Sequence, residues 1–364
     1  MTEQEFELHS TGVFEHGGTV AWQAPSNIAL VKYWGKHPVQ IPANPSLSFT
    51  LNACNTRTEL RYVPLAKPSS SPPFKVFLEG RQAAGFAPKI QAFLEQAVRF
   101  QPFLRHLELE VRTENSFPHS SGIASSASGM AALALCLMEL ERRLVQELTA
   151  EDFSRKASFL ARLGSGSAAR SIDGGLVWWG ADAGVEGSSD LYAIPYPGEV
   201  HPIFEDFHDT ILLVDEGTKA VSSTVGHGLM KDHPFADQRF AQAGRHLHEL
   251  AVILAAGDLE GFATLVESEA LSLHAMMLTS RPAYLLMKPA TLAIIERIRE
   301  FRASSGLPVC FTLDAGANVH VLYPAGSSGE VYNFIKLELL GFCNQGRHIC
   351  DRVGPGAVRL QNEI

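Results

Sequence analysis

A serine-rich loop that runs directly into a long apolar helix constrains this chain more than any other stretch. The loop reads FPHSSGIASSAS, from Phe117 to Ser128, and the apolar helical pattern continues to about Leu144. Small residues let a ligand approach the backbone closely, and five serines supply hydroxyl donors: Gly122, Ala124, Ala127, Gly129, Ser120, Ser121, Ser125, Ser126 and Ser128. The first N–H groups of a helix have no partner inside it, and the helix dipole adds positive character there. These features are typical of a phosphate-binding loop.

An ordinary helix cap is the alternative explanation of this loop, because serine is a favoured N-cap residue. One cap needs one serine, whereas this loop has five, so phosphate binding is favoured. The loop contains neither the GK[ST] of a Walker A motif nor the GxGxxG of a dinucleotide-binding fold. For His119, inside the loop, solvent exposure is favoured over a phosphate contact.

Length and composition limit the class of protein. The 364 residues suffice for two ordinary domains or one large α/β unit. No apolar run reaches the ~20 residues of a bilayer span, so we expect no membrane partner. The net charge of −9 argues against a nucleic-acid partner. An anionic ligand would therefore need a local basic pocket in an acidic protein.

Targeting segments, disulfides and metal motifs are not indicated. Residues 1–18 are acidic and polar, unlike a secretory signal or a transit peptide, so a cytoplasmic location is expected. The five cysteines are scattered and form no CxxC pair. The fourteen histidines form no metal motif. His246 and His248 lie two apart on an expected helix, on different faces, and are expected to be solvated.

The hydrophobic pattern predicts sheets covered by helices. Strands are expected at 46–51 and 56–63, joined by a turn at 52–55. In the second half, strands and long helices are expected at 210–214, 309–313, 319–323, 235–256, 259–275 and 291–304. The proline-rich segment 195–202 is the expected boundary between a domain at 1–197 and one at 198–364. The arrangement indicates an α+β fold with a split βαβ unit.

Two lysines interrupt an apolar run near the N-terminus, in the order Lys32-Tyr33-Trp34-Gly35-Lys36. A lysine in such a run is usually an edge residue whose ammonium reaches water. Two lysines four residues apart, with two aromatic residues between them, are less easily explained as surface. The pattern favours a ligand role.

A second stretch of small residues, GSGSAAR, occupies 164–170. Glycine and serine also form flexible hinges. The position between a helix and an apolar strand, together with an arginine able to bind phosphate bidentately, favours a ligand site. Asp314 follows an apolar strand and precedes Ala315-Gly316, which on sequence alone favours plain turn chemistry. Near bound phosphates, the same carboxylate would accept a proton from an attacking hydroxyl.

Taken together, these stretches resemble the motifs of the mevalonate diphosphate decarboxylases, a branch of the GHMP kinase superfamily. The matching motifs occur in family order: APSNIALVKYWGK (24–36), ENSFPHSSGIASSASG (114–129), GSGSAARSIDGGLVWW (164–179), VSSTVG (221–226) and FTLDAGAN (311–318). The resemblance implies a GHMP kinase fold. In this fold an N-terminal ribosomal-protein-like α/β domain precedes a C-terminal ferredoxin-like split βαβ domain.

The resemblance also implies a reaction, the ATP-dependent decarboxylation of mevalonate 5-diphosphate to isopentenyl diphosphate in isoprenoid biosynthesis. The 3-hydroxyl is phosphorylated first, and ATP and Mg²⁺ are the implied cofactors. Three residues receive catalytic roles. Asp314 faces the 3-hydroxyl, and here the family resemblance outweighs the interpretation of Asp314 as a turn residue. Lys32 lies near the transferring phosphoryl group. Arg170 holds the substrate carboxylate or nearby phosphate oxygens.

Further residues receive binding roles from the same resemblance. The implied substrate-binding residues are Tyr33, Trp34, Lys36, Ser165, Gly166, Ser167, Arg170 and Ser223. The implied ATP-binding residues are Pro118, Ser120, Ser121, Gly122, Ile123, Ala124, Ser125, Ser126 and Ser128. Mg²⁺ is expected to bridge the ATP phosphates, with Ser125 as its protein ligand. The adenine contacts are expected between Asn44 and Gly85, and a homodimer is expected from the superfamily.

Three positions depart from the family pattern. Ser121 replaces a usual alanine, Ala317 replaces a common proline, and Thr224 stands where some bacterial members carry a diphosphate-binding arginine. A weaker diphosphate site keeps an alternative open, a phosphomevalonate decarboxylase or mevalonate 3-kinase of the same family. His227 and Lys231 are candidates to replace the missing arginine.

Overall fold

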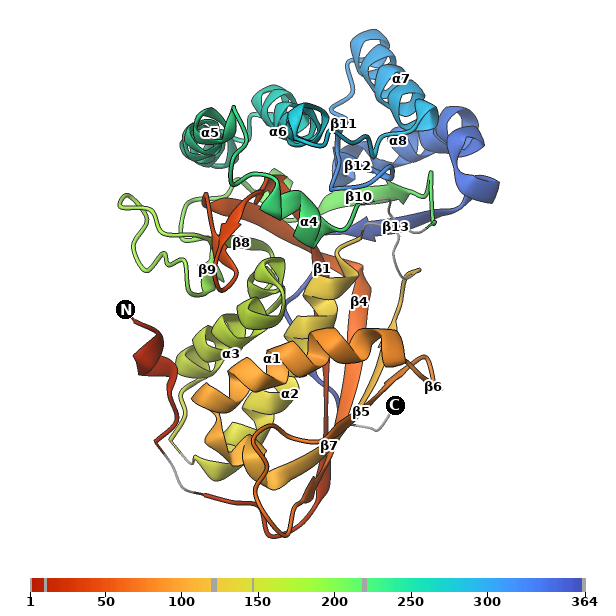
Figure 1. The fold of residues 1–364 in the computed structure, drawn as a ribbon. Coiled ribbons are helices and arrows are strands. Elements are labelled where there is room, and N and C mark those ends of the chain that lie inside the picture. Colours follow the sequence, from red (N-terminus) through yellow and green to blue (C-terminus); the bar gives the residue numbers. More distant parts are fainter. Residues whose placement is uncertain (1, 10–11, 119–122, 146, 218–220, 362–364) are drawn as a thin grey trace.

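The protein has two halves, each a β-sheet covered by helices (Figure 1). The structure is a computed structural model that describes residues 2–9, 12–118, 123–145, 147–217 and 221–361. Over these residues the first sheet has eight strands, β1 (Gly18–Val31), β4 (Ser46–Pro64), β5 (Phe74–Leu78), β6 (Arg81–Gln82), β7 (Leu107–Asn115), β8 (Leu176–Trp179), β9 (Ala193–Pro195) and β14 (Val358–Arg359). The second has four, β10 (Phe207–Leu212), β11 (Cys310–Thr312), β12 (Val319–Pro324) and β13 (His348–Arg352). The predicted α+β class is confirmed.

Two long antiparallel strands, β1 and β4, form the centre of the first sheet. Their register runs from Gly18 opposite Tyr62 to Val31 opposite Leu47. The first part of β4 pairs with β8 on its other edge, and the last part pairs with β7. The motifs at the end of β1 and at the start of β8 are thereby brought close together.

The turn expected at 52–55 is wrong, because β4 continues through it as one strand. The carboxylate of Asp351 accepts hydrogen bonds from the backbone N–H groups of Asn52 (2.9 Å), Ala53 (2.7 Å) and Cys54 (2.8 Å). These donors are satisfied from outside the strand, so the backbone stays extended where polar residues predicted a turn. Asp351 lies 297 to 299 positions along the chain from these three residues, so local sequence could not reveal the contact.

Three helices cover one face of the first sheet: α1 (Ala87–Phe100), α2 (Ser125–Leu144) and α3 (Ala150–Gly164). Most of α2 is buried, as its nearly uninterrupted apolar sequence requires. The N-terminal segment, which had no assigned role, packs against this layer. Phe6 is buried and stacks on Phe159 at a ring distance of 4.1 Å.

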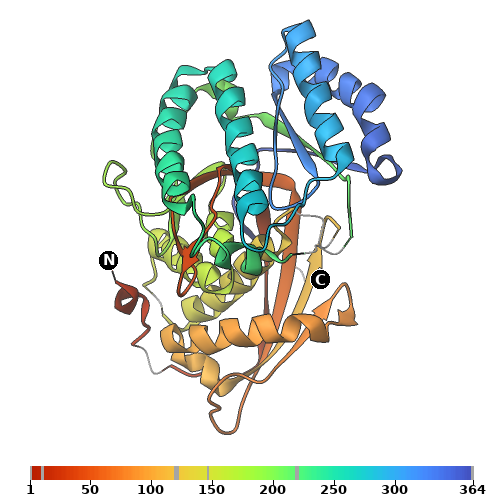
Figure 2. The same cartoon turned by 45° about the horizontal axis from the view of Figure 1, so that its top comes forward.

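The second sheet is covered by α5 (Ala236–Ala256), α6 (Leu259–Thr279), α7 (Pro289–Ser305) and α8 (Ser328–Phe334). Helices α5 and α6 lie side by side (Figure 2) and are joined at Gly257, whose φ of +72° favours glycine. Their buried faces share one apolar cluster with β1 and β4, in which Leu30 and Phe49 meet Leu250 and Phe262. The end of β1 therefore lies beneath α5 and α6.

The short helix α4 (Ser223–Gly228) and the hairpin of β2 (Lys36–His37) and β3 (Ile41–Pro42) lie between the two halves. The last strand, β14, returns to the first sheet and pairs with β1 at Trp22 and Gln23. None of the helices in the described part of the chain is long and apolar enough to cross a membrane.

Candidate active site

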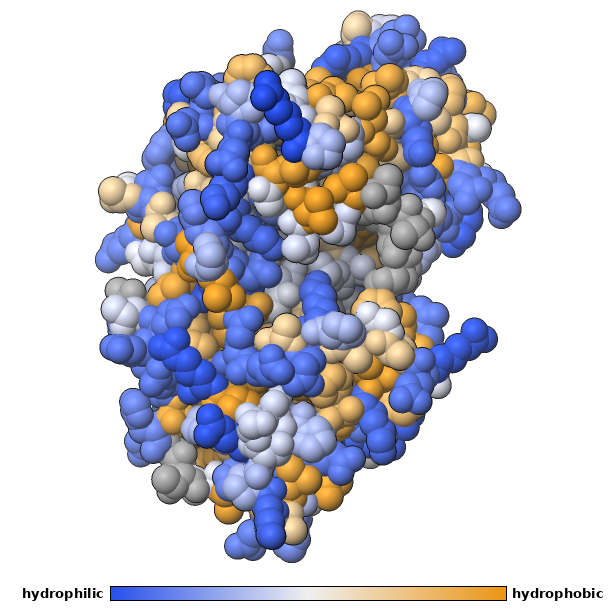
Figure 3. All heavy atoms as spheres, in the orientation of Figure 1, coloured by the Kyte–Doolittle hydropathy of each residue, from blue (hydrophilic) through white to orange (hydrophobic). Residues whose placement is uncertain are grey.

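A cavity lies between the two halves, where the predicted motifs meet, and this face of the molecule is hollowed there (Figure 3). It encloses about 890 Å³, part of which is open to solvent. The predicted residues that line it are Lys32, Tyr33, Trp34, Lys36, Ala124, Ser126, Ser165, Gly166, Ser167, Arg170, Ser223 and Asp314. The structure thus brings five distant motifs to one cavity.

A buried ion pair joins Lys32, just after β1, to Asp314, just after β11. Lys32 Nζ lies 3.2 Å from Asp314 Oδ1; the lysine side chain is 2% exposed and the aspartate side chain 27%. Burial lowers the pKa of Lys32, and the charges of Asp314 and Glu269 oppose that shift. Asp314 lines the cavity, and the Gly316 N–H donates to the Asp314 backbone oxygen.

Arg170 is buried at the cavity wall and contacts neutral groups. Its Nη1 donates to Ser46 Oγ (2.6 Å), its Nε to Ser48 Oγ (3.1 Å) and its Nη2 to Asn27 Oδ1 (3.4 Å). Burial lowers its pKa to about 10, and the largest opposing influence is the charge of Asp314. In the described part of the chain, no carboxylate forms an ion pair with this guanidinium, so its charge is available to an anion in the cavity.

Tyr33 places a buried hydroxyl beside the GSGSAAR segment. This hydroxyl has no hydrogen-bond partner among the described residues. Gly166 is required beside it, because a Cβ there would lie 2.6 Å from the Tyr33 oxygen. Trp34 turns the other way and packs into an apolar cluster with Met230 and Leu273. The two aromatic residues therefore differ, because Tyr33 carries a polar group beside the GSGSAAR segment and Trp34 contributes apolar surface to the cavity.

Lysines also gather at the cavity mouth. Lys36 Nζ bonds to Gln40 Oε1 at 2.9 Å, and Lys89 of α1 lines the same cavity. Desolvation, reinforced by the nearby charge of Lys36, lowers the pKa of Lys89 to about 8. Sequence reasoning missed Lys89, because a single lysine at a helix start carries no motif.

The serine loop reaches the cavity through the start of α2. Ala124, with a φ of +45°, precedes the helix, and among the described residues no side chain caps it. Ser126 lines the cavity and its Oγ lies 3.4 Å from Ser165 Oγ. His119, Ser120, Ser121 and Gly122 lie outside the described residues.

Three other loop residues are placed differently. The Ser128 hydroxyl is buried against Thr56 Oγ1 at 2.6 Å, so it anchors the helix start, and we do not place it among the phosphate ligands. Ile123 is buried in the core shared by the two halves, and Ser26 donates to its carbonyl. Pro118 lines neither of the two cavities described here.

A second, mostly apolar cavity of about 650 Å³ adjoins the first. Ser125, Ser126 and Lys89 line it together with Thr56, Thr58, Val76 and Leu78. The last four fall within the segment 44–85, where adenine contacts were expected. The remaining lining residues come from α1 and the residue before it, from β7 and from α2, for example Phe86, Ile90, Asn115 and Met130.

His227, on α4, is a cavity residue to which the sequence assigned no definite role. Its ring lies 4.4 Å from both the Tyr33 and the Trp34 rings, and its Nδ1 accepts the Gly35 N–H at 3.0 Å. Burial, then the charges of Lys36 and Arg170, lower its pKa to about 3. The ring is therefore neutral at physiological pH, and because Nδ1 accepts, Nε2 carries the proton. Nε2 has no protein partner within the described residues.

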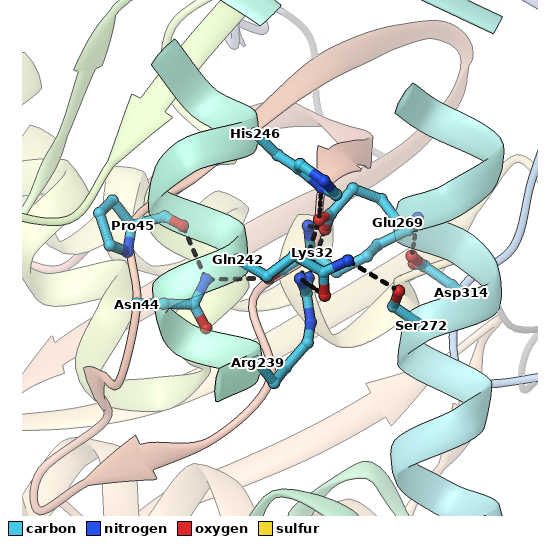
Figure 4. Close-up of polar contacts among 9 residues, drawn as sticks. All are labelled: Lys32, Asn44, Pro45, Arg239, Gln242, His246, Glu269, Ser272 and Asp314. Carbon is cyan, nitrogen blue, oxygen red and sulfur yellow. Dashed lines mark hydrogen bonds and ion pairs between the residues drawn. The ribbon is translucent and has the colours of Figure 1, made fainter. Parts of the chain in front are cut away.

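The expectation of solvated histidines on α5 is correct for His248 and wrong for His246. The His248 side chain is 61% exposed. His246 Nδ1 instead lies 2.5 Å from Oε1 of the buried Glu269 on α6 (Figure 4). Spacing along one helix could not reveal a carboxylate on the next.

Comparisons with known proteins agree with this geometry. Residues 24–193 match the diphosphomevalonate decarboxylase-like N-terminal domain, and residues 210–352 match the mevalonate 5-diphosphate decarboxylase C-terminal domain. The chain is similar to the diphosphomevalonate decarboxylase of Ganoderma lucidum, with 30% identity over 94% of this chain and 86% of the relative.

Solved structures give the same picture. Mevalonate diphosphate decarboxylase from Staphylococcus aureus superposes with a TM-score of 0.80 at 27% identity, covering 96% of this chain and all of that one. MDDEF in complex with MVAPP, AMPPCP and magnesium superposes with a TM-score of 0.79 at 27% identity, covering 95% and 100%. The chain belongs to the diphosphomevalonate decarboxylase family.

Proposed function

We propose that this protein converts mevalonate 5-diphosphate and ATP to isopentenyl diphosphate, ADP, phosphate and carbon dioxide. The observation that carries the proposal is the pairing of Asp314 with Lys32 on one cavity wall. On another wall of the cavity lies the buried Arg170, which has no carboxylate partner in the described part of the chain. Asp314, held by Lys32, suits a base that takes a proton from a substrate hydroxyl, and Arg170 suits a cation that binds a substrate carboxylate.

The substrate is held at its two charged ends. Arg170 binds the carboxylate, with Ser165, Ser167 and the Gly166 segment shaping that wall. The 5-diphosphate lies toward Lys36, Ser223 and Tyr33, which all line the cavity. His227 Nε2–H faces the same group and supplies one of the donors that an arginine at position 224 would have given. Fixing both ends places the 3-hydroxyl at Asp314.

ATP binds across the start of α2. Its phosphates lie against the first N–H groups of that helix and against Ala124 and Ser126, which line the cavity. Its base enters the apolar cavity between Val76, Leu78 and Met130. The two cavities meet at Ser126 and Lys89, which line both, so the γ-phosphate would point toward the substrate.

The first chemical step is phosphoryl transfer. Asp314 accepts the proton of the 3-hydroxyl, the oxygen forms a bond to the γ-phosphorus, and the bond from that phosphorus to the ADP oxygen breaks. Lys32 holds the Asp314 carboxylate in place and adds positive charge near the transferring group. Positioning and charge neutralisation supply most of the catalysis in such transfers.

Mg²⁺ would be held mainly by ATP. Among the described residues no group of three or more His, Cys, Asp or Glu side chains could hold a metal ion. The Ser125 hydroxyl, at the start of α2 beside the phosphates, fits the usual arrangement in which Mg²⁺ takes few protein ligands. When bound, Mg²⁺ neutralises phosphate charge.

The second step forms the alkene. The C3–O bond breaks and phosphate leaves with the bonding pair. The bond between the carboxyl carbon and C2 then breaks, and its electrons form the double bond as carbon dioxide departs. Asp314 gives the proton that it accepted in the first step to the departing phosphate, so its carboxylate is again negatively charged beside the cationic C3. Tyr33 and Trp34, both buried, exclude water that would trap the cation.

The test of this function compares three substrates. Purified protein is given ATP, Mg²⁺ and either mevalonate, its 5-phosphate or its 5-diphosphate, and ADP and carbon dioxide are both measured. We expect the 5-diphosphate to have the highest kcat/KM. A preference for the 5-phosphate would identify a phosphomevalonate decarboxylase instead, and ADP without carbon dioxide from mevalonate would identify a 3-kinase.

Three expectations from the sequence stay predictions. The division into domains at 197/198 is supported by the two family matches, which leave 194–209 between them. The apolar cluster that joins β1 and β4 to α5 and α6 would then be the interface between the domains. Gel filtration and light scattering would test the homodimer. Fractionation of the source cells would test the cytoplasmic location.

A further inference from the structure

Helix α6 carries two buried glutamates two positions apart, Glu267 and Glu269, which face different parts of the molecule. The Glu267 carboxylate accepts hydrogen bonds from Arg299 and Arg302 of α7, away from the cavity. Glu269 is fully buried, and its carboxylate is hydrogen-bonded to Arg239 and His246 of α5. Nothing in the sequence distinguishes these two residues, and neither takes part in the proposed reaction steps.

Both carboxylate oxygens of Glu269 are saturated. Oε1 accepts from Arg239 Nη1 at 2.8 Å and lies 2.5 Å from His246 Nδ1. Oε2 accepts from Arg239 Nη2 and from the backbone N–H of Lys32 at 2.9 Å. Figure 4 shows the side chains of Arg239, His246 and Glu269 pointing toward one another beside Lys32. These four contacts hold the Glu269 carboxylate in a single orientation.

The contact to Lys32 connects this cluster to the reacting groups. The Lys32 amide donates to Glu269, its carbonyl accepts from Asn44 Nδ2 at 3.0 Å, and its ammonium contacts Asp314. The backbone of Lys32 is thus fixed on both sides of the residue whose side chain positions the base. The other end of the pair is fixed as well, since His274 Nε2 of α6 lies 3.1 Å from the Asp314 carbonyl oxygen.

We propose that Glu269, held by Arg239 and His246, is a positioning residue for the reaction, fixing Lys32 and keeping its ammonium charged against Asp314. The inference rests on the proposed function. The charged groups that act on Lys32 are Asp314 after β11, Glu269 on α6, Arg170 beside the GSGSAAR segment and Asp209 on β10, with Arg239 and His246 acting through Glu269. Burial lowers the pKa of Lys32 and Glu269 raises it. Loss of the Glu269 charge therefore lets Lys32 lose its proton at a lower pH.

The experiment compares Glu269→Gln with Glu267→Gln, a matched change of a buried, arginine-paired glutamate on the same helix. Rates of ADP and carbon dioxide formation from mevalonate 5-diphosphate are measured from pH 6 to pH 10, with kcat and both KM values at each pH. For Glu269→Gln we expect kcat to fall about 10- to 100-fold, as for a misplaced catalytic group. We also expect the alkaline limb of kcat to move to lower pH while both KM values change little.

The control and the wild type separate the possible failures. Glu267→Gln should lose thermal stability and keep the wild-type kcat and alkaline limb. If both variants have the same pH profile, Glu269 is only structural and the inference is wrong. If wild-type protein forms no ADP from mevalonate 5-diphosphate, the proposed function fails instead.

A second variant covers the case in which Glu269→Gln does not fold. Glu269→Asp keeps the charge but shortens the reach to the Lys32 amide. It should lower kcat and leave the alkaline limb in place. Wild-type kcat in a folded Glu269→Asp would contradict the positioning role.

Discussion

Two buried lysines of this protein, Lys32 and Lys156, form similar ion pairs, one at the cavity and one inside the helical layer. Each is paired with one carboxylate, and burial lowers the pKa of each. Lys156 Nζ lies 2.8 Å from Glu141 Oε1, the other oxygen of Glu141 accepts from Gln101, and both side chains of the pair are buried in the helical layer. Lys32 pairs with Asp314, whose side chain is 27% exposed to the cavity.

The difference is whether the carboxylate is closed inside the protein or open to a ligand. Glu141 has no free edge toward a cavity described here, so its pair contributes to structure. Asp314 keeps an edge toward the space where Arg170 also lies without a carboxylate partner among the described residues. We therefore expect changes at the open site to alter turnover with little effect on stability, and changes at the closed pair to do the reverse.

The largest expected effect comes from Asp314→Asn, which keeps the shape and removes the base. We expect kcat to fall about 10³- to 10⁴-fold, at the upper end for loss of a general base. ATP binding, measured by fluorescence with a nucleotide analogue, should stay within a few-fold of wild type. Activity within tenfold of wild type would remove Asp314 from the mechanism.

Arg170→Met should follow, with kcat/KM for the 5-diphosphate lowered about 10²- to 10³-fold because the substrate carboxylate loses its cation. The melting temperature should be unchanged or higher, since a desolvated cation without a carboxylate partner is removed from the interior. Arg170→Lys should not restore the rate, because an ammonium cannot replace the planar fork. A lower melting temperature with normal kinetics would instead make Arg170 structural.

Lys156→Met tests the closed pair. Removing one partner leaves Glu141 buried without its cation, so the free energy of unfolding should fall by about 3–5 kcal/mol. The kcat of the protein that remains folded should match wild type. Urea unfolding measures the change in stability, and steady-state kinetics measure kcat. The double variant Lys156→Met/Glu141→Leu should recover much of the stability.

A smaller effect is expected from His227 when the pH falls. Its pKa is about 3 in the folded protein and about 6.5 when unfolded. The unfolded chain therefore binds more protons between these values, and stability is lost as the pH falls through this range. The contribution is about 2 kcal/mol between pH 7 and pH 5. His227→Gln should flatten this part of the stability profile, and an unchanged profile would contradict a buried neutral ring.

Sequence reasoning predicted much of this molecule because its signals were local. The α+β class and the helix after the serine loop followed from the hydrophobic pattern. The approach of Lys32, Arg170 and Asp314 followed from the family resemblance, since Asp314 on its own favoured a turn. The rest depended on partners far along the chain. Asp351 keeps β4 extended at 52–55, and Glu269 captures His246 from the next helix.

The cavity residue Lys89 was missed because it belongs to no motif, whereas His227 was named only as a candidate to replace the arginine absent at position 224. Lys89 begins a helix on the far side of the serine loop, and only the packing of α1 brings it to the cavity mouth. His227 follows Ser223 by one helical turn, which places both beside the cavity. Its place next to a motif is what made His227 a candidate from sequence, and Lys89 has no such neighbour.

The central claim is that phosphorylation and decarboxylation occur on one substrate in one cavity. The most direct test measures ADP, phosphate and carbon dioxide together during turnover of mevalonate 5-diphosphate labelled at its carboxyl carbon. We predict equal amounts of the three products at every time point after the first turnover. ADP formed in excess, with a phosphorylated product that accumulates and keeps its carboxylate, would contradict the claim and identify a kinase.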